Sequence, residues 1–306
     1  MKEVFCVTKQ RYVLITAAKN EQEYIERTIR AVISQTVSPQ KWVIVNDGST
    51  DRTEEIIKRY AKKYEFIQLL QVSENRQRDF CSKVYALHAG YEQLRNEEYE
   101  FVGNLDADVS FDAQYYDKIL EHFLKNPKLG IAGGIIWELL DDRFVSQNIS
   151  LNSVAGAIQL FRRPCYEEIG GYKPLKFGGE DAITEVLARK NGWLVQTFPE
   201  IKVFHHRRVT IGKGNILTTR FRQGMRDYLL GYHPVFYAAM CFYRVIDQPY
   251  FFGSIFKMCG YFWAAIQRER RVVPADFIKY LRWEQVRRLR FVFSKKSEFV
   301  KTSRFV

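Results

Sequence analysis

The 306-residue sequence has only five cysteines, and they are scattered, with no Cys-x-x-Cys pair among them. Such a set predicts neither a disulfide framework nor a structural zinc site, and it favours a reducing compartment such as the cytosol. The N-terminal segment Met1 to Cys6 has no long apolar region and no small-residue cleavage site. These absences argue against secretion.

The signatures of two other nucleotide-binding classes are also missing. The first apolar run, residues 12–16, is followed by Ala17-Ala18-Lys19-Asn20 and not by the glycine fingerprint of a dinucleotide-dependent oxidoreductase, and there is no Walker loop. The sequence pI of about 9.4 suits a nucleic-acid-binding protein, but no zinc finger or ribonucleoprotein motif is present. Nucleic-acid binding therefore stays an alternative, and we expect no nucleic-acid partner.

The sequence contains no convincing membrane span of about 20 apolar residues. Residues 228–243 lack Asp, Glu, Lys and Arg, and residues 248–267 contain only Lys257, but prolines and charges interrupt these runs. Their many aromatic side chains, followed by Arg268, Arg270 and Arg271, suit a helix that lies in the lipid interface. The alternative is that these aromatic residues pack against the rest of the chain as ordinary core.

The net charge of +12 is concentrated in the C-terminal part of the chain. From Arg220 onward there are 17 Lys and Arg residues against six Asp and Glu residues, an excess of 11, so that residues 1–219 are nearly neutral. This asymmetry predicts an anionic partner for residues 220–306, either lipid or nucleic acid. We expect an anionic membrane surface.

The first half of the sequence alternates short β-branched and aromatic runs with segments of helical apolar spacing. The predicted strands are 12–16, 42–46, 66–70 and 100–105, and the predicted helices are 21–34, 53–64 and 79–94. This alternation predicts an α/β fold with a Rossmann-like, mainly parallel sheet flanked by helices. In such sheets ligands bind at the carboxyl ends of the strands, where Ala17, Asp47 and Asp106 fall.

The pattern becomes mixed after Asp108. We expect a helix at 113–124, strands at 130–137 and 155–161, and a helix over 179–191 that places Glu180 and Asp181 at its N-terminus. The predicted domains are a catalytic domain, residues 1–219, and a helical, aromatic and basic region, residues 220–306.

Two carboxylates stand one residue apart in Asp106-Ala107-Asp108, directly after a predicted strand. A strand that ends in Asp-x-Asp places carboxylates at the sheet edge, where they can hold a divalent ion whose other ligands are diphosphate oxygens. Such triplets also occur in ordinary turns, so the motif alone is a weak signal.

Asp106-x-Asp108 belongs to an ordered set of motifs. The others are Tyr12 to Glu21, Trp42 to Asp51, and Gly178-Gly179-Glu180-Asp181. The set resembles the family 2 glycosyltransferases, inverting enzymes that move a sugar from a nucleotide diphosphate donor to an acceptor. The resemblance covers about residues 10 to 210. It implies the GT-A fold and a Mn²⁺ or Mg²⁺ cofactor.

The resemblance also implies roles for individual residues. Asp108 would ligate the metal directly, and Asp106 would lie nearer the ribose or the water shell of the metal. Asp47 would contact the nucleotide base, with Ala17 and Glu21 lining the same pocket. The role of Asp181 would be that of the general base that takes the acceptor proton, which suits a carboxylate near neutral pH.

Other positions are weaker candidates. Arg78 and Lys83 are candidates for diphosphate or base contacts, although basic residues on a helix are usually solvated. His205 or His206 would complete the metal or diphosphate site, and strand parity decides which of them faces inward. Gln223 to Arg226 resembles the Gln-x-x-Arg-Trp element of processive polysaccharide synthases, but Asp227 stands in place of the tryptophan.

The expected function is therefore transfer of a sugar, with UDP favoured as carrier by its frequency in the family. The expected acceptor is a saccharide or lipid-linked saccharide in cell-surface polysaccharide synthesis, and the expected location is cytoplasmic, peripheral on the inner face of the cell membrane. An inactive glycosyltransferase-like scaffold is a further alternative, against which the intact Asp106, Asp108 and Asp181 speak.

Overall fold

A computed structural model describes residues 10–72, 80–140, 143–147, 150–175, 177–207, 216–246 and 250–302. The chain divides into two compact units. The first unit comprises Met1–Lys176 and Glu180–Val209, and the second comprises Phe177–Gly179 and Thr210–Val306. The second unit thus begins its main segment at Thr210. The predicted domain boundary at residue 220 stays a prediction.

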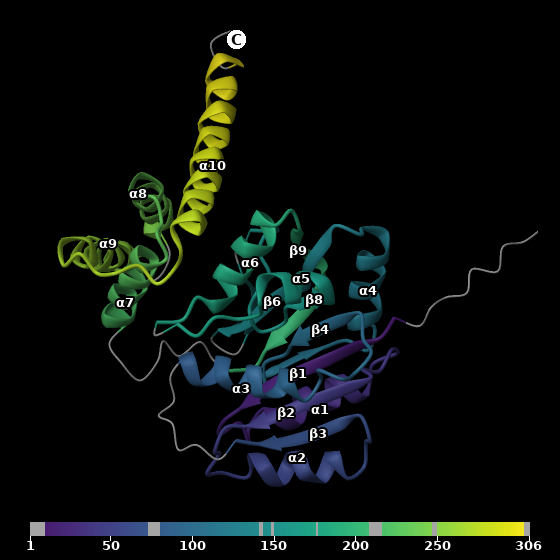
Figure 1. Ribbon diagram of the computed structural model, residues 1–306. Coiled ribbons are helices and arrows are strands. Elements are labelled where there is room, and N and C mark those ends of the chain that lie inside the picture. The colour runs from purple at the N-terminus through teal and green to yellow at the C-terminus, as the bar shows by residue number, and fades with distance from the viewer. Residues whose placement is uncertain are drawn as a thin grey trace, which may run out of the picture. The chain divides into compact units, whose positions relative to one another are not determined.

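The first unit is built on one sheet (Figure 1). Its strands within the described residues are β1 (Tyr12–Ala18), β2 (Lys41–Asn46), β3 (Ile67–Gln71), β4 (Phe101–Asn104), β5 (Val109–Phe111), β6 (Leu129–Leu140), β7 (Arg143–Ser146), β8 (Leu160–Arg162) and β9 (Leu194–His205). Their order is β3-β2-β1-β4-β8-β6-β9-β5, with β7 paired to β6. Strands β3, β2, β1 and β4 run parallel, whereas β8 is antiparallel to both of its neighbours. The predicted α/β fold with a mixed sheet is confirmed.

Six helices of the first unit are described: α1 (Ile25–Ile33), α2 (Thr53–Ala61), α3 (Phe80–Glu92), α4 (Tyr115–Lys125), α5 (Arg163–Ile169) and α6 (Glu180–Lys190). Helix α3 packs on β1 and β2, and α4 packs on β6 and β9. The second unit contains α7 (Ile216–Leu229), α8 (Pro234–Tyr243), a 3₁₀ turn (Arg244–Ile246), α9 (Tyr250–Ile266) and α10 (Ala275–Thr302).

The core of the first unit lies along β1 and β2. These strands are continuous apolar runs because a parallel sheet covered by helices is buried on both faces. Tyr12, Val13 and Leu14 are fully buried, as is Trp42, whose indole N–H donates to Thr16 Oγ1 at 2.9 Å. Burial of these strands fixes where they end, and therefore where the side chains that follow them lie.

Strand β9 pairs with β6 through an irregular register. Gly134 is opposite Phe198, but the next residue, Ile135, is opposite Lys202, so β9 carries extra residues at this point. A Cβ on Gly134 would lie 2.3 Å from the carbonyl oxygen of Ile201, which shows how closely the two backbones approach. This bulge bends β9 before it reaches β5, where His205 pairs with Val109.

Some elements differ from the sequence expectation. Strands β5 and β7 were not predicted, because three or four residues carry too little periodicity. The expected strand at 155–161 is shorter, since Ala155 to Ile158 forms a turn, closed by Ile158 N donating to the Ala155 oxygen at 3.1 Å, and β8 begins at Leu160. This turn brings residues 155–159 to the end of β4.

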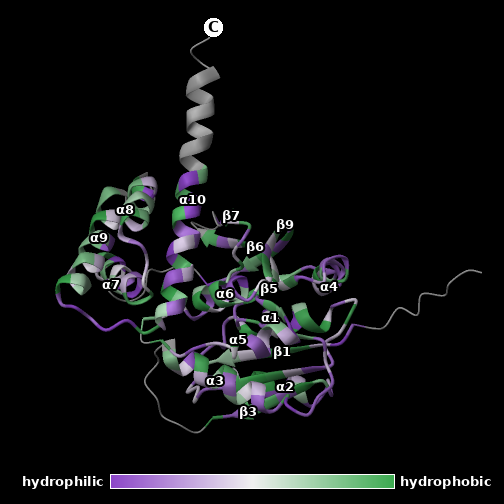
Figure 2. Cartoon of the chain, turned by 45° about the horizontal axis from the view of Figure 1, so that its top comes forward, coloured by the Kyte–Doolittle hydropathy of each residue, from purple (hydrophilic) through white to green (hydrophobic). Residues whose placement is uncertain are grey.

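Helix α9 of the second unit has an unusual distribution of side chains. Its buried positions include Gly253, Ser254, Gly260 and Ala264. Its large apolar residues, Phe251, Phe252, Ile255, Phe262, Trp263 and Ile266, are 42–75% exposed. Figure 2 shows the apolar colouring along α8 and α9. None of the described helices is both long enough and apolar enough to span a membrane.

The small residues of α9 allow close contact with α7. A Cβ on Gly224 would lie 2.0 Å from the carbonyl oxygen of Lys257, and one on Gly260 would lie 2.0 Å from that of Phe221. Both obstructing atoms belong to the backbone, so a side-chain rotation cannot make room.

We predict that Gly260→Ala destabilises the second unit, because the added methyl group forces α7 and α9 apart. Overpacking of this kind costs about 1–3 kcal/mol. This cost opposes the higher intrinsic helix propensity of Ala compared with Gly. The measurement is hydrogen exchange of the α7 and α9 amides under native conditions. Cys259→Ala, at the neighbouring exposed position, is the matched control and should leave exchange unchanged. Equal exchange in the Gly260 variant and the wild type would contradict the packing.

Candidate active site

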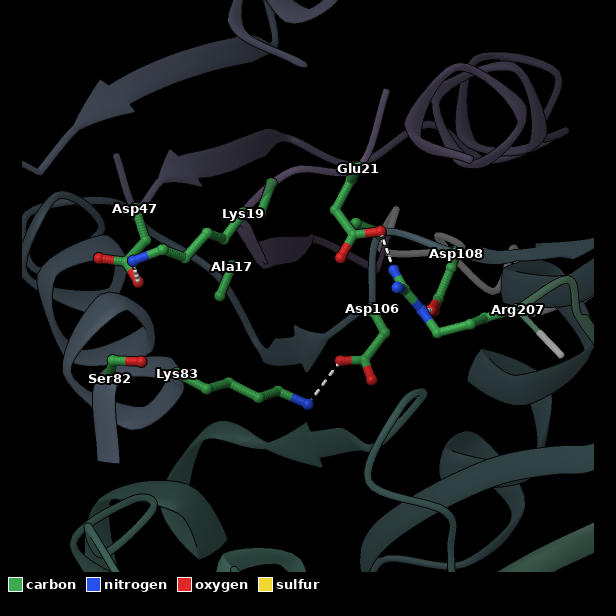
Figure 3. A pocket seen from close by; sticks show the side chains of 11 residues that line it. Ala17, Lys19, Glu21, Asp47, Ser82, Lys83, Asp106, Asp108 and Arg207 are labelled. Atoms are coloured by element: carbon green, nitrogen blue, oxygen red, sulfur yellow. Dashed lines mark hydrogen bonds and ion pairs between the residues drawn. The ribbon is translucent and has the colours of Figure 1, made fainter. Parts of the chain in front are cut away.

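The first unit has a cavity of about 420 Å³ at the carboxyl ends of β1, β2 and β4 (Figure 3). Its described lining residues are Ala17, Ala18, Lys19, Glu21, Asp47, Ser82, Lys83, Asp106, Ala107, Asp108 and Arg207. Four carboxylates thus enter one cavity from different strand ends and connections. Each of them lies beside a cationic side chain of the same chain.

Asp47 follows β2 and is 6% exposed. Its backbone N–H donates to the Ala18 oxygen at 2.9 Å, which holds it against the end of β1. Lys19 Nζ lies 3.4 Å from Asp47 Oδ2. This end of the cavity therefore presents a positioned carboxylate with a partly exposed lysine beside it.

Asp106 lies in the connection between β4 and β5, and its Oδ1 accepts a hydrogen bond from Lys83 Nζ at 2.7 Å. Burial alone would lower the pKa of Lys83, but the charge and hydrogen bond of Asp106, with Glu180 and Asp181 beyond, outweigh burial and raise it. Lys83 from α3 therefore stays charged beside Asp106.

Asp108 is 7% exposed and lies beside two cationic groups. Its Oδ2 accepts a hydrogen bond from Arg207 Nε at 2.7 Å, and its Oδ1 lies 3.2 Å from His205 Nε2. Burial would raise the pKa of Asp108, but the interactions with His205 and Arg207 outweigh it and lower the pKa to about 2. Asp108 is therefore ionised at neutral pH.

The two histidines at the end of β9, His205 within the strand and His206 after it, have different partners. His205 lies beside Asp108, and this carboxylate raises the pKa of His205 despite the opposing effect of burial. His206 lies 2.7 Å from Ser110 Oγ through Nε2 and 3.4 Å from Arg27 through Nδ1, and burial lowers its pKa. Strand parity thus brings His205, and not His206, to Asp108.

Asp181 is half-buried in the first turn of α6. Its Oδ1 accepts the backbone N–H of Ala182 at 2.8 Å. A Cβ on Gly156 would lie 2.9 Å from Oδ2 of Asp181, so glycine at this position leaves room around that oxygen. Oδ1 is therefore held by the first turn of the helix. Oδ2 faces Gly156, which has no side chain to occupy the space beside it.

The turn at 155–159 connects Asp181 to the Asp106 side of the site. Asp106 N donates to the Ala157 oxygen at 2.9 Å, Asn104 N donates to the Gln159 oxygen at 2.9 Å, and the Asn104 side chain donates to the Gly156 oxygen. The same turn contacts Asp181 through Gly156. Backbone hydrogen bonds thus fix the end of β4 relative to α6.

Residues 13–177, more than half of the chain, match the sequence profile described as Glycosyl transferase family 2. The chain belongs to this family. It is 30% identical over 195 residues to the poly-beta-1,6-N-acetyl-D-glucosamine synthase of Staphylococcus epidermidis, a match that covers 57% of the chain and 43% of that protein. The chain therefore spans less than half of the length of this curated relative.

Solved structures agree on the fold of this family 2 glycosyltransferase. The mannosyltransferase PcManGT from Pyrobaculum calidifontis, in complex with GDP-Man and Mn²⁺, matches with a TM-score of 0.54 at 17% identity, over 89% of this chain and 78% of that one. TarS from S. aureus in complex with UDP-GlcNAc matches with a TM-score of 0.52 at 15% identity, over 70% and 65%. The predicted GT-A fold is confirmed.

The structure brings most of the predicted donor-site residues of this glycosyltransferase into one cavity: Ala17, Glu21, Asp47, Lys83, Asp106 and Asp108. Asp181 and His205 lie outside the set of described lining residues, and Arg78 lies outside the described residues altogether. Sequence reasoning missed Lys19, Ser82 and Arg207. Arg207 stands two positions after His205, but the bulge in β9 sets which of these side chains reach the cavity, so the sequence carried no sufficient signal for Arg207.

A buried carboxyl group supports α6 from behind Asp181. Glu185 is 4% exposed and accepts hydrogen bonds from Val154 N at 2.6 Å and from Ser153 Oγ at 2.9 Å. Burial raises the pKa of Glu185 from 4.5 to about 7, against the opposing effect of these hydrogen bonds. Between these two pH values the folded state retains a proton that the unfolded state releases.

We predict that the free energy of unfolding falls as pH rises from about 4.5 to about 7, by at most about 3 kcal/mol, because each pKa unit corresponds to about 1.4 kcal/mol. Below pH 4.5 the contribution of Glu185 is fully present, and above pH 7 it is lost. Chemical denaturation at several pH values measures this slope. Glu185→Gln should make this slope shallower and leave the contribution of Glu180, whose pKa burial also raises, whereas a variant with the full wild-type slope would show that Glu185 is not responsible.

Proposed function

We propose that this family 2 glycosyltransferase is a metal-dependent, inverting enzyme. It transfers a sugar from a nucleoside diphosphate donor, with UDP as the favoured nucleotide. The acceptor is a saccharide or lipid-linked saccharide in cell-surface polysaccharide synthesis. The observation that carries the proposal is the convergence of Asp47, Asp106 and Asp108 in one cavity. The turn at 155–159 accepts a hydrogen bond from Asp106 N and lies against Asp181 through Gly156. A donor site and a base are thus adjacent.

The residues around Asp108 fit a divalent cation. Asp108 Oδ1 is buried and lies 3.2 Å from His205 Nε2, but this pair lacks hydrogen-bond geometry, so the oxygen keeps an acceptor position for a cation. No group of three or more His, Cys, Asp and Glu in the described part of the chain is arranged to hold a metal ion. Mg²⁺ and Mn²⁺ at diphosphates commonly use one or two carboxylates, with phosphate and water oxygens as other ligands. Asp108 would therefore hold the ion, with Asp106 in its water shell and His205 as a further candidate ligand.

When bound, such an ion would neutralise the charge that grows on the departing diphosphate. Asp47 would contact the nucleotide base, in the pocket lined by Ala17 and Glu21. Lys83 is a second cationic group at the diphosphate, since it lies beside Asp106 in the same cavity. Binding by several strand ends would hold the anomeric carbon toward α6.

Asp181 would act as the general base. The acceptor hydroxyl oxygen forms a bond to the anomeric carbon, and the bond from that carbon to the diphosphate oxygen breaks, with its electron pair leaving on the nucleoside diphosphate. The hydroxyl proton passes to Asp181 Oδ2, because Oδ1 already accepts the Ala182 N–H. A single displacement of this kind inverts the configuration at the anomeric carbon.

The relatives support the donor class. TarS and PcManGT were solved with UDP-GlcNAc and GDP-Man, and PcManGT with Mn²⁺ as well. The curated relative from Staphylococcus epidermidis is named as a polysaccharide synthase. A nucleoside diphosphate sugar and a saccharide acceptor are therefore the substrates to test first. The donor should be tested both as a UDP-sugar and as a GDP-sugar.

We predict that Asp181→Asn lowers turnover by at least about 10²-fold and leaves donor affinity within about twofold, because the amide cannot take the acceptor proton. Product formation from UDP-sugars and calorimetric binding of UDP with Mn²⁺ measure the two effects. Asp112→Asn, an exposed aspartate after β5, is the control for loss of one negative charge. Equal losses of donor affinity and rate in the Asp181 variant would make it a donor-site residue instead.

We further propose that the second unit binds an anionic membrane surface, which would place the enzyme in the cytoplasm, peripheral on the inner face of the cell membrane. Helix α9 exposes Phe251, Phe252 and Ile255 in one stripe with Phe262, Trp263 and Ile266, and its opposite side buries small residues together with Tyr261. Exposed apolar residues in a continuous stripe indicate an interaction site. The excess of 11 positive charges from Arg220 onward selects an anionic lipid surface over a neutral partner.

We predict co-sedimentation with vesicles that contain anionic lipids, weakening as salt is added, because each basic residue near such a surface contributes about 1 kcal/mol that salt screens. Changing Phe252, Phe262 and Trp263 to serine should lower binding further at constant salt. The matched control changes Leu124, Val145 and Leu151, which are equally exposed in the first unit, to serine. Tight binding to RNA or DNA with no vesicle binding at low salt would overturn the proposal.

A further inference from the structure

Backbone pairing of the residues next to Arg207 places it at the cavity. It follows β9, whose last residue, His205, pairs with Val109 of β5. The backbone N–H of His206 donates to the Asp108 oxygen at 2.9 Å. The main chain of Arg207 is therefore anchored next to Asp108, and its side chain has only a short distance to cover to reach the carboxylate.

The guanidinium group joins two carboxylates from different parts of the chain. Nε donates to Asp108 Oδ2 at 2.7 Å, and Nη2 donates to Glu21. Asp108 lies in the β4–β5 connection and Glu21 lies between β1 and α1. The guanidinium carbon also lies 5.1 Å from the ring centre of Tyr24, which is a cation–π distance. Figure 3 shows Arg207 between the two acidic side chains.

The same Asp108 carboxylate is the proposed metal ligand. A guanidinium on Oδ2 places a positive charge within a few ångströms of any cation that binds this carboxylate, and like charges at such distances repel strongly in a partly buried site. A divalent ion at Oδ1 of Asp108 is therefore opposed by the guanidinium on Oδ2, and the repulsion is relieved when Arg207 gives up its bond to Asp108. Once displaced, the guanidinium needs another anion, and diphosphate oxygens match its planar arrangement of donors.

We propose that Arg207 is the built-in counter-cation of the donor site: it competes with the divalent cation for Asp108, and it makes binding of that cation and of the diphosphate cooperative. The inference rests on the proposed donor site. Without a nucleotide, a metal ion binds against Arg207. With a nucleotide, the diphosphate supplies the anion that accepts the displaced guanidinium, so each ligand favours the other.

The experiment titrates the purified 306-residue protein with Mn²⁺ and follows free Mn²⁺ by electron paramagnetic resonance, first without a nucleotide and then with UDP or GDP. The variants are Arg207→Gln, which removes the charge, and Arg207→Lys, which keeps it. Arg95→Gln, an exposed arginine paired with Glu92, is the control for the loss of one positive charge. Asp108→Asn shows how much Mn²⁺ binding depends on the proposed ligand, and thermal unfolding establishes that each variant is folded.

Without a nucleotide, we expect Arg207→Gln to bind Mn²⁺ more tightly than the wild type, on the order of tenfold. In the wild type the nucleotide increases the affinity for Mn²⁺, and in Arg207→Gln this increase should be smaller by a similar factor. Arg207→Lys and Arg95→Gln should stay within about twofold of the wild type for Mn²⁺ alone. If folded Arg207→Gln binds Mn²⁺ no more tightly than the wild type, or if no variant binds it, Arg207 is not a competitor and the inference is overturned. If neither UDP nor GDP binds to any protein, the proposed donor fails, whereas the Mn²⁺ titration still decides the competition.

Discussion

The structure depends on how several carboxylates are brought to one edge of a sheet without repelling one another. Asp47, Asp106, Asp108 and Glu21 all line a single cavity, and three basic side chains lie beside them. Parallel strands place the side chains that follow them at the same edge. The local fold therefore brings negative charges close together, and the cationic side chains of Lys19, Lys83 and Arg207 compensate for their repulsion. Any ligand of this site must replace or reuse these internal ion pairs.

The position of Asp181 relative to that edge is set by backbone contacts. The turn at 155–159 accepts hydrogen bonds from residues at the end of β4, and its Gly156 lies against Asp181 and leaves room beside that carboxylate. Glu185, one turn further along α6, is buried against the beginning of the same turn. The carboxylates of the cavity and the proposed base are thus parts of one hydrogen-bonded framework, and a change in that turn affects both.

Much of this could be predicted from the sequence, for reasons that are specific to certain residues. The strands before Ala17, Asp47 and Asp106 are strongly apolar, so their ends, and hence the cavity, were predictable. Arg207 was not, because its role depends on a salt bridge to Glu21 across 186 positions of the chain. The choice between His205 and His206 was also undecided, since parity in β9 depends on the bulge opposite Gly134. Arg78 lies outside the described residues, and its role stays a prediction.

The bulge between β6 and β9 has a consequence for how this site can change. Side chains along a strand alternate between its two faces, so the number of residues inserted at Phe198 to Lys202 sets the phase of everything that follows. With one residue fewer, His206 would take the place of His205, with one residue more Phe204 would take it, and in both cases Arg207 would turn to the opposite face. A change of length in this bulge would therefore exchange the side chains beside Asp108 without any substitution of His205 or Arg207.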